Sequence, residues 1–178
     1  LEEPEESYAF EEGKENIYNS IANEVWHSKK SRLETKDIEH PEIQEIFGYL
    51  QEARRLEDNL YSYTVETRIL LDMARAKEGK EVVETVNRAI NLIQRGLKNE
   101  SDYEGRKRLQ ERQVDLWKEI DEDLAEKAAE DLLRERDSGE GYYTLACMKY
   151  YEEQKPHHAL NMLDKAMGAS EYPSQAAY

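Results

Sequence analysis

The stretch GYYTLACMKYYEEQKPHHALNMLDKAM, residues 141–167, decides the fold because a proline separates its two apolar segments. Proline is favoured in the first turn of a helix, so the stretch predicts helices at 142–153 and 156–167. Small side chains occur where the two backbones would approach, and bulky ones lie between them. The small ones are Ala146, Cys147, Ala159 and Ala166, and the bulky ones are Tyr143, Tyr150, Leu160 and Leu163. This alternation predicts a tight helical hairpin.

Apolar residues recur at three-to-four spacing through the rest of the chain, which predicts further helices over 8–30, 41–76, 81–97 and 103–137. Whether 41–76 forms one helix or two, with a break near 59–61, is left open by the pattern. In the first helix the expected buried stripe is Ile17, Ile21 and Val25, with Tyr18, Ala22 and Trp26 beside it. No long run alternates apolar and polar residues, so the chain is predicted to be all-α.

The predicted helices group into three regions. Residues 1–13 are acidic and are expected to form a solvated, frayed terminus. Residues 14–100 are expected to form helical hairpins of irregular length, and residues 101–178 to form repeat-like units. The sequence lacks an initial Met, and a new helix would begin within 174–178. We therefore expect a segment of a longer protein, with the units continuing beyond its end.

The hairpin at 140–173 resembles the tetratricopeptide repeat, a helix-turn-helix unit of about 34 residues. The resemblance rests on Tyr143, Ala146, Cys147, Tyr150, Ala159, Leu163 and Ala166. Cys147 replaces the usual glycine, and Pro173 falls two places late. A weaker match covers 106–139, through Leu109, Leu116, Ala125, Ala129 and Leu132. The resemblance implies a degenerate array of stacked antiparallel hairpins or a right-handed α-solenoid.

The same resemblance implies that the first helix of each unit lines a concave, peptide-binding face. Aligned by the repeat register, two groups of residues in this sequence would line that face. The alternative is that they are ordinary exposed helix residues. The first group is Thr144, Met148, Tyr151 and Glu152, and the second is Lys107, Gln110, Val114 and Trp117.

The charge of the chain limits its partners. With 25 Lys and Arg against 40 Asp and Glu, the formal net charge is -15, and the mean hydropathy is -0.98. Such a field repels phosphate backbones and anionic membranes, so no nucleic acid or membrane partner is expected. It favours a basic protein or peptide, or only keeps an exposed helical array soluble. The basic stretches 29–36 and 105–112 are interrupted by Glu and are interpreted as solvated faces or contacts for an acidic peptide.

The sequence contains no apolar run of the roughly 18 to 20 residues that a membrane span needs. A single cysteine excludes an internal disulfide bond and fits a reducing compartment, so a cytoplasmic location is expected.

No catalytic or metal-binding motif is present, including G-x-S-x-G, a phosphate-binding loop, G-x-G-x-x-G and H-E-x-x-H. Glu24 and His27 have the Glu-x-x-His spacing of di-iron bundles, but the second candidate, Asp37 and His40, lies in a connector. Residues 157–158 are adjacent histidines that diverge by about 100° on a helix, so both cannot easily bind one ion. Neither a cofactor nor a metal is therefore expected.

Two functions from different classes fit these observations. The first is a non-catalytic helical scaffold that mediates protein or peptide interaction. The second is a regulatory or sensor domain of a larger enzyme, such as a signalling or defence NTPase, with the catalytic part outside this segment.

Overall fold

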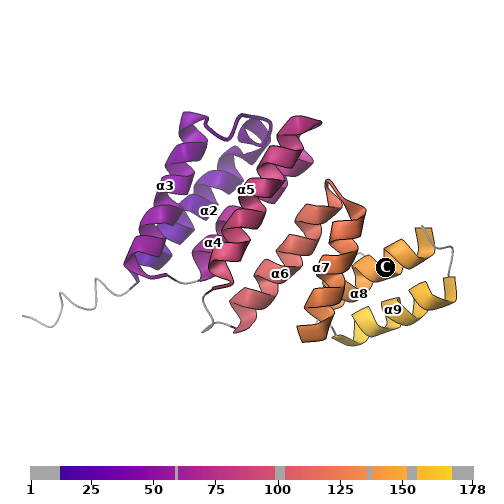
Figure 1. Cartoon of the computed structure of the whole chain (residues 1–178). Helices are drawn as coiled ribbons and strands as arrows, with labels where there is room; N and C mark the ends of the chain where they lie inside the picture. The colour runs from indigo at the N-terminus through magenta and orange to yellow at the C-terminus, as the bar shows by residue number, and fades with distance from the viewer. Residues whose placement is uncertain (1–12, 59, 99–102, 136–137, 152–155, 170–178) are drawn as a thin grey trace, which may run out of the picture. The chain divides into compact units, whose positions relative to one another are not determined.

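The computed structural model describes residues 13–58, 60–98, 103–135, 138–151 and 156–169 (Figure 1). These residues contain eight helices and no strand, which confirms the all-α prediction. The helices are α2 (Lys14–Leu33), α3 (Pro41–Leu56), α4 (Leu60–Arg75), α5 (Lys80–Gly96), α6 (Tyr103–Lys118), α7 (Glu122–Glu135), α8 (Gly139–Tyr151) and α9 (Pro156–Ala169). The chain divides into two compact units, Leu1–Gly105 and Arg106–Tyr178.

The first unit is built from two hairpins, α2 with α3 and α4 with α5. Helix α3 begins at Pro41, as predicted, and the His40 imidazole accepts a hydrogen bond from the Glu42 backbone N–H. It ends at Leu56, and α4 begins at Leu60, so 41–76 forms two helices rather than one. Helix α4 is the most deeply buried element of this unit. Its buried residues are Leu60, Ser62, Val65, Glu66, Thr67, Ile69, Leu70, Leu71, Met73 and Ala74.

The buried stripe of α2 differs from the predicted one. Ile17 is 53% exposed, and Ile21 is also exposed. The face that packs inward instead contains Glu15, Asn19, Ala22, Trp26 and Leu33. The burial of Ala22 and Trp26 confirms part of the predicted face, whereas the burial expected of Ile17 and Ile21 was wrong. The pattern counted only apolar residues, and α2 also meets α4 through polar ones.

Four α2 residues at helical spacing make these polar contacts with α4. The Ser62 hydroxyl donates to Asn19 Oδ1 over 2.8 Å, and both side chains are buried. About two turns further along α2, the Trp26 indole donates to Asp72 Oδ2 over 2.9 Å. The remaining contacts are Arg68 with Asn23, and Lys30 with the other oxygen of Asp72 at 2.8 Å. Directional hydrogen bonds therefore fix the rotation of α2, because a buried polar group without a partner is costly.

An ionic contact joins the end of α2 to the start of α3. Arg32 and Lys29 both donate to Oε2 of Glu42, over 2.6 and 2.8 Å. The hydrogen bond from Arg32, followed by the one from Lys29, lowers the pKa of Glu42 to about 2. The carboxylate therefore stays charged at neutral pH and anchors the connector between the two helices.

The second unit contains the hairpin that the opening stretch predicted. Ala146, Ala159 and Ala166 are buried where α8 and α9 pack together, as expected for small residues at a close contact. Leu160, expected to supply bulk between them, is instead 58% exposed. That expectation was wrong because adjacent helix residues point about 100° apart, so the burial of Ala159 turns Leu160 toward solvent.

The polar segment 103–137 is divided into α6 and α7 by a turn that hydrophobic periodicity alone did not reveal. The Asp121 carboxylate accepts a hydrogen bond from the Leu124 backbone N–H over 2.9 Å, which caps the start of α7. Beyond the turn, helices α6, α7 and α8 share an apolar cluster. Its buried members are Val114, Ala129, Leu132 and Leu145.

The first prediction concerns the buried hydrogen bond between α2 and α4. Ser62→Ala should lower the free energy of unfolding by about 1–3 kcal/mol, because it leaves the buried Asn19 amide without this bond. Adding Asn19→Leu should cost less than the two single changes together. Urea denaturation measures both. Ser28→Ala, which alters an exposed hydroxyl, is the control, and an equal effect of the two serine variants would contradict the prediction.

The second prediction concerns the contact between α8 and α9. Ala159→Leu should cost roughly 1–3 kcal/mol, because the added methylenes overpack a site that is already closed. Leu160→Ala, one residue along, should change stability by less than about 0.5 kcal/mol. Thermal unfolding followed by circular dichroism compares the pair. Unchanged melting of Ala159→Leu would mean that the two helices do not pack through this residue.

Candidate functional site

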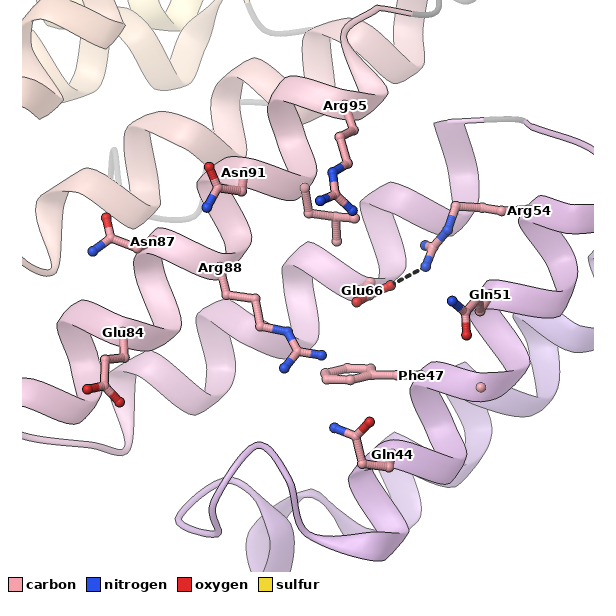
Figure 2. A pocket seen from close by; sticks show the side chains of 12 residues that line it. Gln44, Phe47, Gln51, Arg54, Glu66, Glu84, Asn87, Arg88, Asn91 and Arg95 are labelled. Atoms are coloured by element: carbon pink, nitrogen blue, oxygen red, sulfur yellow. Dashed lines mark hydrogen bonds and ion pairs between the residues drawn. The ribbon is translucent and has the colours of Figure 1, made fainter.

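A groove of about 710 Å³ opens on the first unit (Figure 2). One wall comes from α3 and the other from α5, and α4 contributes Glu66 between them. Phe47 and Leu92 are buried at its base. The lining residues are Gln44, Phe47, Gly48, Gln51, Arg54, Glu66, Glu84, Asn87, Arg88, Asn91, Leu92 and Arg95.

Helical spacing explains why these residues line one groove. Their positions on α3 and on α5 advance by three or four, so each set occupies one face of its helix. Gly48 keeps the space open on the α3 side. A Cβ atom built at Gly48 would meet no atom within 4 Å.

An ion pair between α3 and α4 lies at one end of the groove. Arg54 Nη2 donates to Glu66 Oε2 over 2.7 Å, and the two side chains are only 16% and 7% exposed. The guanidinium also lies over the ring of Tyr63, 5.0 Å from its centroid. Burial of the Tyr63 hydroxyl, and to a smaller extent its hydrogen bond to Asp58, raises the pKa of Tyr63, so this hydroxyl stays neutral. Arg54 Nη1 has no hydrogen-bond partner among the described residues.

The other two arginines come from α5. Arg88 lies over the Phe47 ring, 5.3 Å from its centroid (Figure 2). It also forms an ion pair with Glu39 at 3.2 Å. Arg95 is exposed, and it has neither an ion pair nor a side-chain hydrogen bond within the described part of the chain. The same holds for Glu84, which lies nearer the start of α5. Within the described residues, the groove therefore has one cation, Arg95, and one anion, Glu84, without an ion pair.

A second hollow of about 310 Å³ continues the groove past Glu84 and Arg88, which line both. Its other lining residues are Asp37, Ile38, Glu39, Lys77, Glu81 and Thr85. Lys77 is paired with Glu81 at 4.0 Å. Carboxylates therefore gather at this end, whereas Arg54 and Arg95 lie at the other.

The groove lining is rich in side chains that form hydrogen bonds. Four of the lining residues are Asn or Gln, whose amides both donate and accept hydrogen bonds. The groove lining includes no Ser, Cys, His or Lys that would act as a nucleophile or general base. Among the residues that the structure describes, no three His, Cys, Asp or Glu side chains are grouped to hold a metal ion.

The predicted peptide-binding residues of the second unit fall into three groups. Thr144 and Met148 are 2% and 8% exposed, and Val114 is fully buried. These three do not form an open face, a correction that follows from the packing of α8 against both α7 and α9 and of Val114 into the shared cluster. The half-buried residues are Lys107, Gln110 and Trp117, which stay predictions. Glu152 and the Tyr151 side chain lie outside the described residues.

The groups considered for metal or thiol chemistry are dispersed. Cys147 is half-buried, and His157 and His158 are exposed on α9. His27 is exposed on α2, whereas His40 caps α3.

Comparisons of the chain with protein-family models, curated proteins and solved structures found no match. Within the described ranges, none of the helices combines the length and the apolar character required to cross a membrane. The function is therefore inferred from the groove itself.

The groove was missed by sequence reasoning, although α5 contained a signal for it. Asn87, Asn91 and Arg95 recur every four residues on the face opposite the apolar stripe of this helix. Uncharged amides in that position add little to solubility or to helix stability, which distinguishes them from an ordinary charged surface.

The third prediction concerns the ion pair in the groove. Arg54→Met should destabilise the protein by about 3–5 kcal/mol, because Glu66 would be left buried and unpaired. Arg54→Met with Glu66→Leu should recover most of that loss. Arg55→Met is the matched control, since the partner of Arg55, Glu52, is exposed and its loss should change stability little. Equal urea midpoints for Arg54→Met and Arg55→Met would contradict the assignment.

Proposed function

We propose that this chain is a non-catalytic interaction module, and that its first unit binds an extended peptide segment of another protein. The observation that supports this most directly is the set of amides along the groove. They are Gln44, Gln51, Asn87 and Asn91. Gln44 already donates to the Ile38 carbonyl over 2.7 Å. An amide side chain has one acceptor and two donors, which matches the peptide groups of a bound strand whatever its side chains are.

The size of the groove suits a short peptide. Glu84 and Arg95 are separated by about three turns of α5, which is about 16 Å. An extended chain covers that distance with about five residues. The groove volume of about 710 Å³ also falls within the range of roughly 300–1,000 Å³ that is usual for ligand sites.

The apolar base and three amides without a side-chain partner among the described residues support the same function. Phe47 and Leu92 offer a surface on which one side chain of the peptide would be buried. The side-chain amides of Asn87, Asn91 and Gln51 make no hydrogen bond to another described residue, so their hydrogen-bonding capacity is available. Binding would replace water on these groups without breaking contacts within the protein.

The charge of the groove modifies the expectation of a basic partner. That expectation followed from the net charge of -15. The lining of the larger hollow, however, has three arginines and two glutamates, and Glu66 is already paired with Arg54. A negative group on the partner is therefore favoured near Arg95, even though the chain as a whole is acidic.

We place the protein in the cytoplasm. The sequence has a single cysteine, Cys147, which is free and half-buried. A free thiol with no disulfide partner is typical of a reducing compartment.

The fourth prediction tests the groove through Gly48. A library of random ten-residue peptides displayed on phage is selected on the wild-type protein, and the enriched peptides are made with a fluorescent label. Gly48→Trp should weaken their binding by at least about ten-fold, because its side chain enters the empty space beside Gly48. Gly48→Ala should keep the affinity and stabilise α3 by about 0.5–1 kcal/mol. Fluorescence anisotropy measures the binding.

Two results would overturn the proposed function. The first is the absence of any enriched peptide. The second is equal binding of the enriched peptides by Gly48→Trp and wild type, with both proteins shown to be folded by circular dichroism.

A further inference from the structure

The charges of the groove are ordered from one end to the other. Glu84 lies toward the start of α5, Asn91 follows, and Arg95 lies near its end, as Figure 2 shows. Arg54 adds a second positive charge at the Arg95 end. The opposite end has three further carboxylates around the smaller hollow. They are Asp37, Glu39 and Glu81.

Contacts between the described residues leave one charge without an ion pair at each end of the groove. Arg88 is paired with Glu39, and Arg54 is paired with Glu66. Arg95 and Glu84 have no such partner among the described residues, and both are exposed. A ligand can therefore form an ion pair with either one at no cost to an existing contact.

From this arrangement we infer that the groove selects a peptide that carries an acidic and a basic residue about five positions apart. The acidic side chain pairs with Arg95 and the basic one with Glu84. The spacing follows from the distance of about 16 Å between the two, which about five extended residues cover. This inference rests on the proposed function and adds the identity of the ligand class.

The order of charges also excludes other ligands. A wholly acidic segment would meet Glu84 and the carboxylates around the smaller hollow, and a wholly basic one would meet Arg95 and Arg54. Like charges brought together in a partly desolvated groove oppose binding. Opposite charges held by charge-assisted hydrogen bonds favour it. A peptide with both charges at the right spacing avoids each penalty.

Selection of the same random peptide library on three proteins tests the inference. On the wild type, enriched peptides should contain Asp or Glu about five positions from Lys or Arg. On Arg95→Ala the acidic preference should disappear while the basic one stays, and on Glu84→Ala the reverse should hold. Each variant should bind the wild-type peptides about ten-fold more weakly, as expected for the loss of one charged hydrogen bond. Arg108→Ala and Glu24→Ala, exposed charges elsewhere, should bind them as the wild type does.

Exchange of the charges provides the sharpest comparison. Arg95→Glu combined with Glu84→Arg should reject the wild-type peptides and bind versions in which the acidic and basic residues have been exchanged. A merely structural role of the two residues would produce loss without this rescue. Failure of the exchanged peptides to bind a folded double variant would overturn the inference.

The two proposals fail in different ways. Peptides that Gly48→Trp blocks, but that lack paired charges or bind Arg95→Ala unchanged, would overturn the charge selection and leave peptide binding in place. The absence of enriched peptides on the wild type would overturn both.

Discussion

The first unit depends on the burial of α4. Ten of its sixteen residues are buried, so neighbouring helices must cover it on several sides. Helix α2 does so largely through hydrogen bonds, whereas α3 and α5 contribute apolar stripes. Because α3 and α5 both pack toward α4, part of each helix faces the space between them rather than a partner. The groove is therefore a direct consequence of covering a helix that is too apolar to face water.

The charge order of the groove arises from ordinary helix electrostatics. Acidic residues favour the first turns of a helix and basic residues the last, because they offset the partial charges of the helix ends. In the first half of α3, Phe47 lies under the guanidinium of Arg88 from α5. Near the ends of the two helices, the positive charges of Arg54 and Arg95 both favour a lower pKa of Tyr63, so both lie close to it. Helices α3 and α5 therefore run in the same direction. Parallel neighbours place like ends together. What stabilises each helix separately therefore gives their shared groove a positive and a negative end.

The sequence was most informative where small residues or a proline set the geometry. The start of α3 at Pro41 and the burial of Ala146 and Ala159 could be predicted, because sterics at those positions leave few alternatives. The rotation of α2 could not be, since it depends on hydrogen bonds between Asn19 and Ser62, residues 43 positions apart. The prediction that Thr144 and Met148 on α8 face an open surface was wrong for a similar reason. Whether Thr144 and Met148 meet solvent depends on neighbours that no local pattern specifies, and the groove is likewise a product of three helices.

Gly48 places the stability of α3 and the openness of the groove in opposition. A glycine within a helix costs about 0.5–1 kcal/mol relative to alanine, and no neighbouring atom obliges this position to lack a side chain. Redesign for stability alone would replace it, and every larger side chain would take up more of the groove. A stability assay would therefore favour replacing Gly48, whereas a binding assay would disfavour a large side chain there. A residue that weakens its own helix is here the one that leaves room for a ligand.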